Sequence, residues 1–313
     1  MDEFYDFEAA KKGLVELATQ REGEIYNALA TTKMMGYSVQ QFYNPTTWRI
    51  VKESDNPTAR EECVLRLHGI LSELDLPPVS RQSLQPKKQL PHLRQQVGIT
   101  LLDSKLETSY MDKLLVVYHF LCRAHRNGFV AKWGPSEFRD YVQLNAHSRY
   151  FTSGNYAKFT ESVPFRPMVD PDNALSNVSG TDLVHGTDNV VDYLRLVRET
   201  GQIYYEETNP ASFRVGDIVE LEISPMALGV KGNSEAKFTL ILRSIIMLDD
   251  SHSIHATFAR AKASMPRLVP AIKLIRKTAS DEKEERDVII ARRGVALLNI
   301  ERQGDESDMN ITN

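Results

Sequence analysis

The strongest constraint on the fold is a pair of β-rich runs separated by a short polar turn. The first run covers residues 213–223, the second covers residues 237–247, and the turn at residues 229–233 holds two glycines. The first run ends in alternating apolar and acidic residues, which predicts a strand with one wet face. The second run is almost continuously apolar, which predicts a central strand buried on both faces. Together they predict the hairpin of an antiparallel β unit.

The first half of the chain has a different pattern. Apolar residues recur at helical intervals in four stretches, residues 8–30, 56–74, 109–127 and 134–142. Such spacing predicts amphipathic helices that each bury one face. Residues 77–102 hold four prolines, several glutamines and basic residues but no acid. That composition predicts an extended, mobile connection.

After about residue 150, short β-branched and aromatic runs replace the long apolar stripes. Residues 190–197 and 203–207 flank a turn that contains Gly201, which predicts a second hairpin. The apolar residues of 188–197 also fit helical spacing, so a short helix there is an alternative. Both interpretations place β structure between residues 150 and 250.

These patterns predict an α+β protein with three parts. Residues 1–149 form a mainly helical N-terminal half, and residues 150–250 form an antiparallel β-sandwich or a partly open β-barrel. Residues 251–313 form a basic helical extension that ends in a disordered tail.

Composition and charge limit the partners of the chain. The formal net charge is -4 and the isoelectric point is near 6.1, so any attraction to nucleic acid must be local. Two cysteines, Cys63 and Cys122, are too few for a disulfide framework and indicate a reducing compartment. The acidic start and the lack of a long apolar run predict neither a leader peptide nor a membrane span. We therefore expect a cytoplasmic or nuclear protein without a membrane partner.

Motifs for catalysis and cofactor binding are weak. The chain has no phosphate-binding glycine loop and no Gly-x-Ser-x-Gly elbow, so we expect no cofactor. We favour a binding protein over an enzyme for the same reason. A zinc site would need convergence of His119, Cys122 and His125 with Cys63 or His68. Buried cysteines without a metal are much more common, so we expect no metal site.

One arrangement nevertheless leaves an enzymatic alternative open. Asp217 opens one predicted strand, and Glu235 and Lys237 open the next. An acid on one strand and Glu-x-Lys on its neighbour could hold Mg²⁺ and place a lysine beside a water nucleophile. The alternative function is therefore an Mg²⁺-dependent nuclease, and it requires these three side chains to converge.

The most distinctive partner surface is basic. Residues 251–280 contain no acid, and the lysines and arginines there could contact several phosphates. The predicted nucleic-acid-binding residues are Arg260, Lys262, Arg267, Lys273, Arg276 and Lys277. The ordinary explanation is a solvated helix face that balances the acidic run at 281–287. The favoured function is a non-catalytic binding protein, with nucleic acid as the partner. A third possibility is a self-assembling structural or protein-interaction module that pairs through its sheet edges.

Three segments carry a resemblance to known proteins. They are residues 188–193 (DNVVDY), 213–220 (FRVGDIVE) and 240–249 (LILRSIIMLD). In this order they resemble a multicopy family of uncharacterised proteins from mushroom-forming fungi. The resemblance covers roughly residues 185–265 and implies no activity. The high copy number of that family implies an association with mobile elements.

Overall fold

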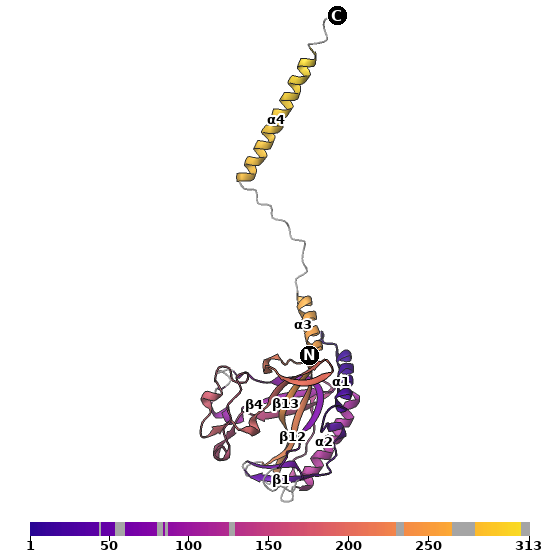
Figure 1. Ribbon diagram of the computed structural model, residues 1–313, viewed down its shortest axis with the longest axis vertical. Coiled ribbons are helices and arrows are strands. Elements are labelled where there is room, and N and C mark those ends of the chain that lie inside the picture. Colours follow the sequence, from indigo (N-terminus) through magenta and orange to yellow (C-terminus); the bar gives the residue numbers. More distant parts are fainter. Residues whose placement is uncertain are drawn as a thin grey trace. The chain divides into compact units, whose positions relative to one another are not determined.

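The computed structural model describes residues 1–43, 45–53, 60–79, 84, 87–124, 129–229, 235–264 and 279–307. The chain divides into two compact units, Met1–Ser264 and Met265–Asn313 (Figure 1). The described part of the second unit is one helix, α4 (Ala279–Ser307). No boundary separates the first 149 residues from the β structure that follows, because strands from both parts belong to one sheet.

Within the described ranges, the first unit contains one eleven-stranded mixed sheet and a small two-stranded sheet. The large sheet consists of β1 (Tyr37–Tyr43), β2 (Thr46–Lys52), β3 (Leu65–Asp75), β4 (Arg94–Thr100), β5 (Phe129–Val130), β6 (Ser136–Phe138), β7 (Tyr141–Arg149), β10 (Asp192–Glu199), β11 (Gln202–Glu207), β12 (Ile218–Gly229) and β13 (Glu235–Asp249). The small sheet pairs β8 (Thr152–Ser153) with β9 (Leu183–Val184). The short 3₁₀ helices are η1 (Leu29–Thr31), η3 (Lys87–His92), η4 (Gly154–Phe159), η5 (Ser176–Val178), η6 (Thr187–Asn189) and η7 (Pro210–Ser212).

Five of the strands pair in a closed circuit. Its order is β3, β4, β7, β13, β12 and back to β3. Neighbours in the circuit are antiparallel except β7 and β13, which run parallel. A sheet that closes on itself in this way is a small β-barrel, whose interior is filled by side chains. The barrel core includes the buried residues Leu67, Val97, Ile99, Leu144, Ala146, Leu240 and Leu242.

The helices α1 and α2 lie along one side of the strands (Figure 1). α1 (Phe7–Glu22) begins after Asp6, whose carboxylate accepts a hydrogen bond from the Ala9 amide at 2.9 Å and so caps the helix. α2 (Lys105–Ala124) buries a stripe that consists of Leu106, Tyr110, Leu114, Val117 and Leu121. α3 (Ser251–Ser264) follows β13 directly and buries Ser253 and Ala256.

The predicted division into a helical half and an antiparallel β domain is wrong. The first strand begins at Tyr37, and β3, β4 and β7 of the barrel come from the part of the chain that was expected to be helical. The sheet is also not purely antiparallel, because β13 pairs in parallel with β5, β7 and β10. The strands of the barrel are therefore drawn from positions 65 to 249, and neither predicted part folds separately.

Three of the expected local structures also differ. The helix expected over residues 56–74 is replaced at its C-terminal part by β3, and the helix expected over residues 134–142 is replaced by the β6–β7 hairpin. The mobile connection expected over residues 77–102 contains η3 and the barrel strand β4. Its residues 80–83 and 85–86 lie outside the described part of the chain.

Other expectations are confirmed. The hairpin expected around residues 213–247 is β12 and β13, and the hairpin around Gly201 is β10 and β11, with Gly201 at a φ of 80°.

The alternative of a helix over residues 188–197 is wrong apart from the short η6. In the second unit, α4 covers residues 281–287 and 301–307, which were expected to be mobile or disordered.

Candidate functional site

The outer surface of the barrel at β4 and β7 carries the candidate site. Along β7, Leu144 and Ala146 are buried, whereas Asn145 and Arg149 are exposed and His147 is half-buried. Successive strand residues point to opposite faces, so the odd-numbered residues of β7 share the outer face. The β4 residues opposite to them, Arg94, Gln96 and Gly98, lie on the same face.

Three neighbouring hollows follow this face. The largest, called the central cavity below, has a volume of about 400 Å³ and lies between β7 and β13, with Trp133 and Ser136 on a further wall. A second hollow of about 290 Å³ shares Arg94 and Gln96 with it. A third of about 200 Å³ shares His147. These shared residues make the three hollows neighbours on the outer face of β4, β7 and β13.

The parting of β7 from β13 opens the central cavity. These two strands share a single backbone pair, His147 with Ile241. Residues 144–146 of β7 and 237–240 of β13 both line the cavity, and the described part of the chain offers them no backbone pairing across it. Backbone N–H and C=O groups need a partner, so these two strand edges can accept hydrogen bonds from, or donate them to, a ligand.

A cluster of cations surrounds His147. Arg94, Arg149 and Lys237 are exposed, and none of their side chains has a hydrogen-bond or ion-pair partner among the described residues. Burial, together with the charges of these three residues, lowers the pKa of His147 to about 4. The imidazole is therefore neutral near pH 7, while the three cations around it remain uncompensated. Such a surface attracts an anion.

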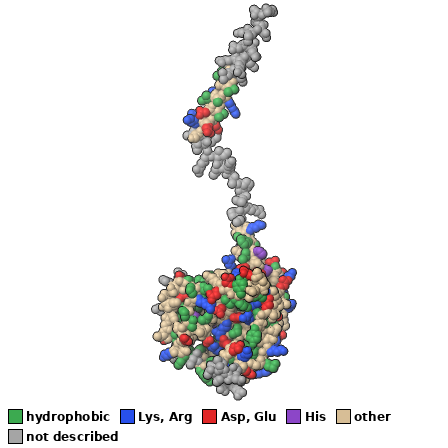
Figure 2. Space-filling model, in the orientation of Figure 1, with side chains coloured by type: hydrophobic (Ala, Val, Ile, Leu, Met, Phe, Trp, Pro, Cys, Tyr) green, Lys and Arg blue, Asp and Glu red, His purple; other side chains and the backbone are tan. Residues whose placement is uncertain are grey.

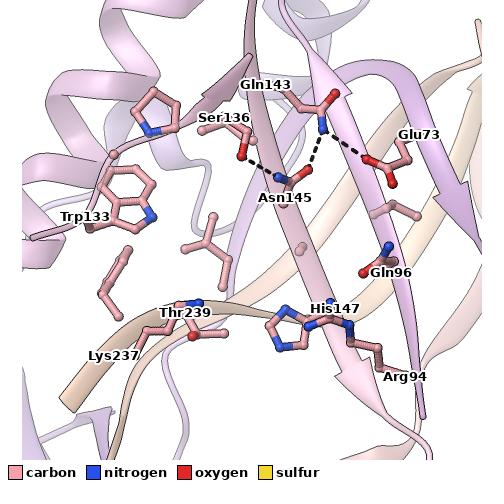
Figure 3. A pocket seen from close by; sticks show the side chains of 17 residues that line it. Glu73, Arg94, Gln96, Trp133, Ser136, Gln143, Asn145, His147, Lys237 and Thr239 are labelled. Atoms are coloured by element: carbon pink, nitrogen blue, oxygen red, sulfur yellow. Dashed lines mark hydrogen bonds between the residues drawn. The ribbon is translucent and has the colours of Figure 1, made fainter. Parts of the chain in front are cut away.

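A hydrogen-bonded run of side chains forms the opposite part of the cavity (Figure 3). Asn145 donates to the Ser136 hydroxyl at 2.8 Å, and Gln143 donates to Asn145 Oδ1 at 2.8 Å and to Glu73 Oε2 at 3.3 Å. The Ser72 hydroxyl donates to Gln143 Oε1 at 2.7 Å, which fixes the amide of Gln143. The run therefore reaches the exposed Glu73 carboxylate at the edge of the cavity through its bond from Gln143.

Gly98 makes room for this run. A Cβ at position 98 would lie 2.8 Å from the side-chain amide of Gln143 and 2.9 Å from Asn145 Oδ1. Both distances are shorter than a van der Waals contact, so a larger residue would have to displace the amides.

Arg149 also lines the third hollow, but the two other cations there, Arg49 and Arg243, differ because they already have partners. Arg49 donates to both oxygens of Asp188 at 3.0 and 2.7 Å, and Arg243 donates to both oxygens of Glu62 at 2.9 and 2.7 Å. Charge-assisted bonds of this bidentate kind are strong and fix the guanidinium groups. The uncompensated positive charge is thus concentrated around His147.

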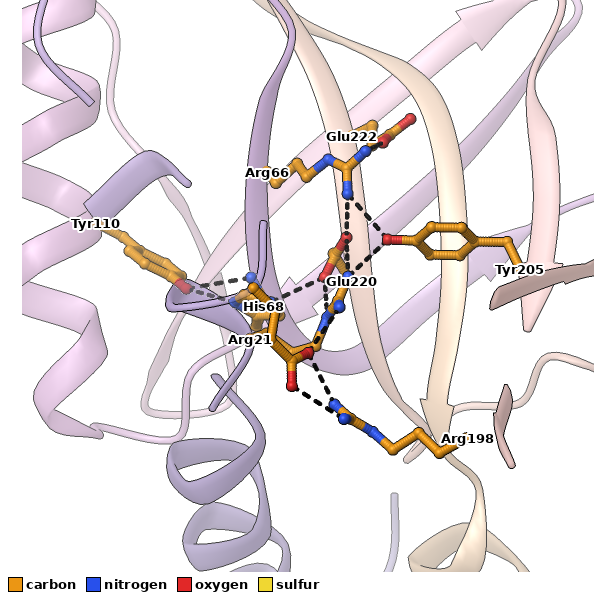
Figure 4. Close-up of polar contacts among 9 residues, drawn as sticks. Arg21, Arg66, His68, Tyr110, Arg198, Tyr205, Glu220 and Glu222 are labelled. Carbon is orange, nitrogen blue, oxygen red and sulfur yellow. Dashed lines mark hydrogen bonds and ion pairs between the residues drawn. The ribbon is translucent and has the colours of Figure 1, made fainter. Parts of the chain in front are cut away.

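A second polar cluster is buried and structural (Figure 4). Arg21 of α1 is 1% exposed and donates to Glu220 of β12 at 2.9 Å. Glu220 also lies 3.2 Å from His68 Nε2, and Tyr110 of α2 lies 3.0 Å from His68 Nδ1. Burial acts to raise the pKa of Glu220, but hydrogen bonds from His68 and Arg21 outweigh it and lower that pKa to about 2. None of these residues lines the three hollows, so the cluster joins two helices to the barrel.

The three residues of the nuclease alternative do not converge. Asp217 precedes β12 at the end where Ile218 pairs with Asp249, whereas Glu235 and Lys237 lie at the other end of the β12–β13 hairpin. The twelve or so residues of β13 between them span roughly 40 Å at about 3.3 Å per residue. Asp217 is buried and accepts hydrogen bonds from the Arg214 amide at 2.7 Å and from the Ser253 hydroxyl. The three side chains therefore lie too far apart to form the metal site that the nuclease hypothesis requires.

Of the six residues predicted to bind nucleic acid, two lie in the described part of the chain. Arg260 of α3 pairs with Asp2, and its Nε donates to Asp2 Oδ2 at 2.7 Å. Lys262 is exposed on the same helix. Arg267, Lys273, Arg276 and Lys277 fall outside the described residues. Their role as phosphate contacts stays a prediction.

Two further properties concern the described residues alone. They contain no group of three or more His, Cys, Asp and Glu side chains that could hold a metal ion. No helix in these ranges is long and apolar enough to span a membrane.

The outer face of β4 and β7 was missed in the sequence, although a signal was present. Polar residues alternate with buried ones from Gln143 to Arg149, which is typical of a strand with one wet face. The preceding helical spacing and the basic composition of residues 77–102 concealed it. Of the cations, only Lys237 belonged to a sequence-predicted site, and that site was the nuclease.

No protein-family model matches the chain, and no curated protein matches it either. The resemblance to fungal proteins therefore stays a prediction.

Proposed function

We propose that this chain is a non-catalytic protein that binds single-stranded nucleic acid on the outer face of β4 and β7. The observation that carries the proposal is the cluster of Arg94, Arg149 and Lys237, three cations around the neutral His147 with no described partner. Phosphate groups spaced along a strand would compensate these charges in turn.

The shape of the site favours a linear ligand. The three neighbouring hollows lie across several strands, whereas a compact molecule would need only one of them. Trp133 lines the central cavity and Tyr156, which is 39% exposed, lines the third hollow. Aromatic rings of this kind are platforms on which bases stack, and a positive groove beside them follows the phosphates. An oligosaccharide would use the rings and amides but would leave the cations uncompensated.

The barrel topology supports the same ligand class. Numbered along the chain, the five barrel strands pair in the order 1-2-3-5-4-1, with strands 3 and 5 parallel. This is the strand order of the OB-fold, whose second and third strands bind oligonucleotides and oligosaccharides on their outer face. Here the second and third strands are β4 and β7. The connection between the third and fourth strands differs from the usual one, because residues 150–217 contain no α-helix within their described structure. The analogy supports a ligand class, and the cation cluster decides the site.

A nucleic-acid ligand agrees with the cytoplasmic or nuclear location that the sequence predicts. The functional assignment nevertheless depends on binding, so the test is a titration. Fluorescence anisotropy would follow labelled single-stranded DNA and RNA of about 12 nucleotides, a length within the range that OB-folds cover. The same titration would be repeated with duplexes and at several salt concentrations.

The decisive variant replaces Arg94, Arg149 and Lys237 with glutamine. We expect weaker binding of every sequence and a salt slope reduced by about 2, since each phosphate contact on a single strand contributes roughly 0.7. The matched control replaces three exposed lysines that line none of the hollows, Lys12, Lys33 and Lys105. It changes the net charge equally and should leave the slope unchanged. Equal effects of the two triple variants would refute the proposed interface.

A further inference from the structure

We propose that the central cavity is a subsite for one guanine base. This inference rests on the proposed function, because it places a single base of the bound strand between β7 and β13. The cavity volume of about 400 Å³ is large enough for one nucleotide and too small for a stacked pair. Its walls offer a ring, two backbone edges, a carboxylate and a cation.

Glu73 supplies the selective group. Its Oε2 accepts from Gln143, and its other oxygen has no hydrogen-bond partner within the described residues. An ionised carboxylate has no donor and can accept several hydrogen bonds. It therefore suits a base edge that presents two adjacent donors.

Guanine is the one standard base with such an edge. Its N1–H and exocyclic N2–H point the same way and can donate together to one carboxylate. Adenine and cytosine place an acceptor nitrogen beside their amino group, and uracil and thymine have a single N–H. Each of those bases would leave the carboxylate with an unfavourable or missing contact.

The remaining groups complement guanine as well. Gln96 and Arg94 lie beyond Glu73 along the same wall (Figure 3), and neither side chain has a described hydrogen-bond partner. Both can donate to guanine O6 or N7, which is a common use of arginine at guanine. Trp133, packed edge-to-face against Phe238 at 5.1 Å between ring centroids, gives the base an aromatic wall.

The test compares guanosine and inosine 5′-monophosphates by isothermal titration calorimetry with the full chain. Inosine lacks only the exocyclic amino group, so the difference reports the contact to Glu73. We expect guanosine monophosphate to bind roughly tenfold more tightly, as for loss of one hydrogen bond to a charged group. Glu73→Gln should remove this preference, and because inosine keeps its N1–H, its binding should weaken less than that of guanosine monophosphate. Glu137→Gln, an exposed residue on β6 outside the cavity, is the matched control.

The outcomes separate the two proposals. If single strands bind but guanosine and inosine monophosphates bind equally, the guanine subsite is refuted and the interface stands. If guanosine monophosphate binds selectively through Glu73 but no oligonucleotide binds, the subsite stands and the proposed function fails. If neither binds, both are wrong. A preference that survives Glu73→Gln also overturns the subsite.

Discussion

At the scale of single residues, two buried acids of this protein have pKa values that are shifted in opposite directions. Glu220 stays ionised because Arg21 and His68 contact it, whereas Asp217 has no cation within its buried hydrogen bonds. Burial raises the pKa of Asp217 to about 6, although bonds from Ser253 and the Arg214 amide oppose the shift. The charged groups around it are Arg214 and Asp250, and Tyr5 packs nearby.

A pH dependence follows from the raised pKa of Asp217. The folded state binds this proton more tightly than the unfolded chain, so its stabilising effect is complete below about pH 4 and is lost as the pH rises through 6. The loss amounts to about 3 kcal/mol in the free energy of unfolding, from roughly two pKa units. Asp217→Asn mimics the protonated acid and should remove this pH-dependent loss of stability. Urea titrations of the original protein and the variant between pH 4 and 7 would show the difference in their free energies of unfolding growing with pH. The exposed Asp112→Asn is the control, and a difference that is independent of pH would contradict the argument.

At the scale of elements, the sequence predicts a strand or helix well where a turn or a clear apolar stripe marks it. The β10–β11 hairpin and α2 were foreseen, because the first has a glycine turn and the second a clear apolar stripe. β3 was mistaken for a helix because residues 67–72 are buried on both faces, which hides the two-residue period. Its buried His68 is satisfied by Tyr110 and Glu220, residues distant in sequence. Such long-range pairing also assembled the site, so composition alone could not locate it.

The antiparallel pairing of β4 with β7 gives a prediction at the same scale. Gly98→Ala would press against the amides of Gln143 and Asn145, so the run that holds Glu73 should shift. We expect a loss of about 1–3 kcal/mol in stability, typical of overpacking, and a reduced preference for guanosine over inosine monophosphate. Gly134 lines the same cavity, but a Cβ there would meet nothing within 4 Å. Gly134→Ala should therefore leave both quantities unchanged. Equal behaviour of the two variants, measured by thermal unfolding and calorimetry, would remove the role given to Gly98.

At the scale of the whole molecule, the distribution of charge matters more than its sum. The chain has 38 basic and 42 acidic residues, and both kinds are intermixed on the visible face of the first unit (Figure 2). Attraction to a polyanion must therefore come from local sets of cations without partners. Two sets compete for that role: the residues around His147, and the basic residues predicted after Asp250. The residues around His147 lie in the first unit, together with Arg260 and Lys262. The other predicted basic residues lie in the second unit.

Removing residues 265–313 distinguishes these two sets. The truncated chain keeps the complete first unit, so its thermal unfolding midpoint should equal that of the full chain. If the barrel face is the interface, the affinity for single-stranded DNA should change by less than about twofold, with the same dependence on salt. If Arg267, Lys273, Arg276 and Lys277 make the phosphate contacts, the slope should fall by about 3, at roughly 0.7 for each. Anisotropy titrations of both chains over a range of salt concentration measure this slope directly. A large fall with unchanged stability would move the interface from the barrel to the extension.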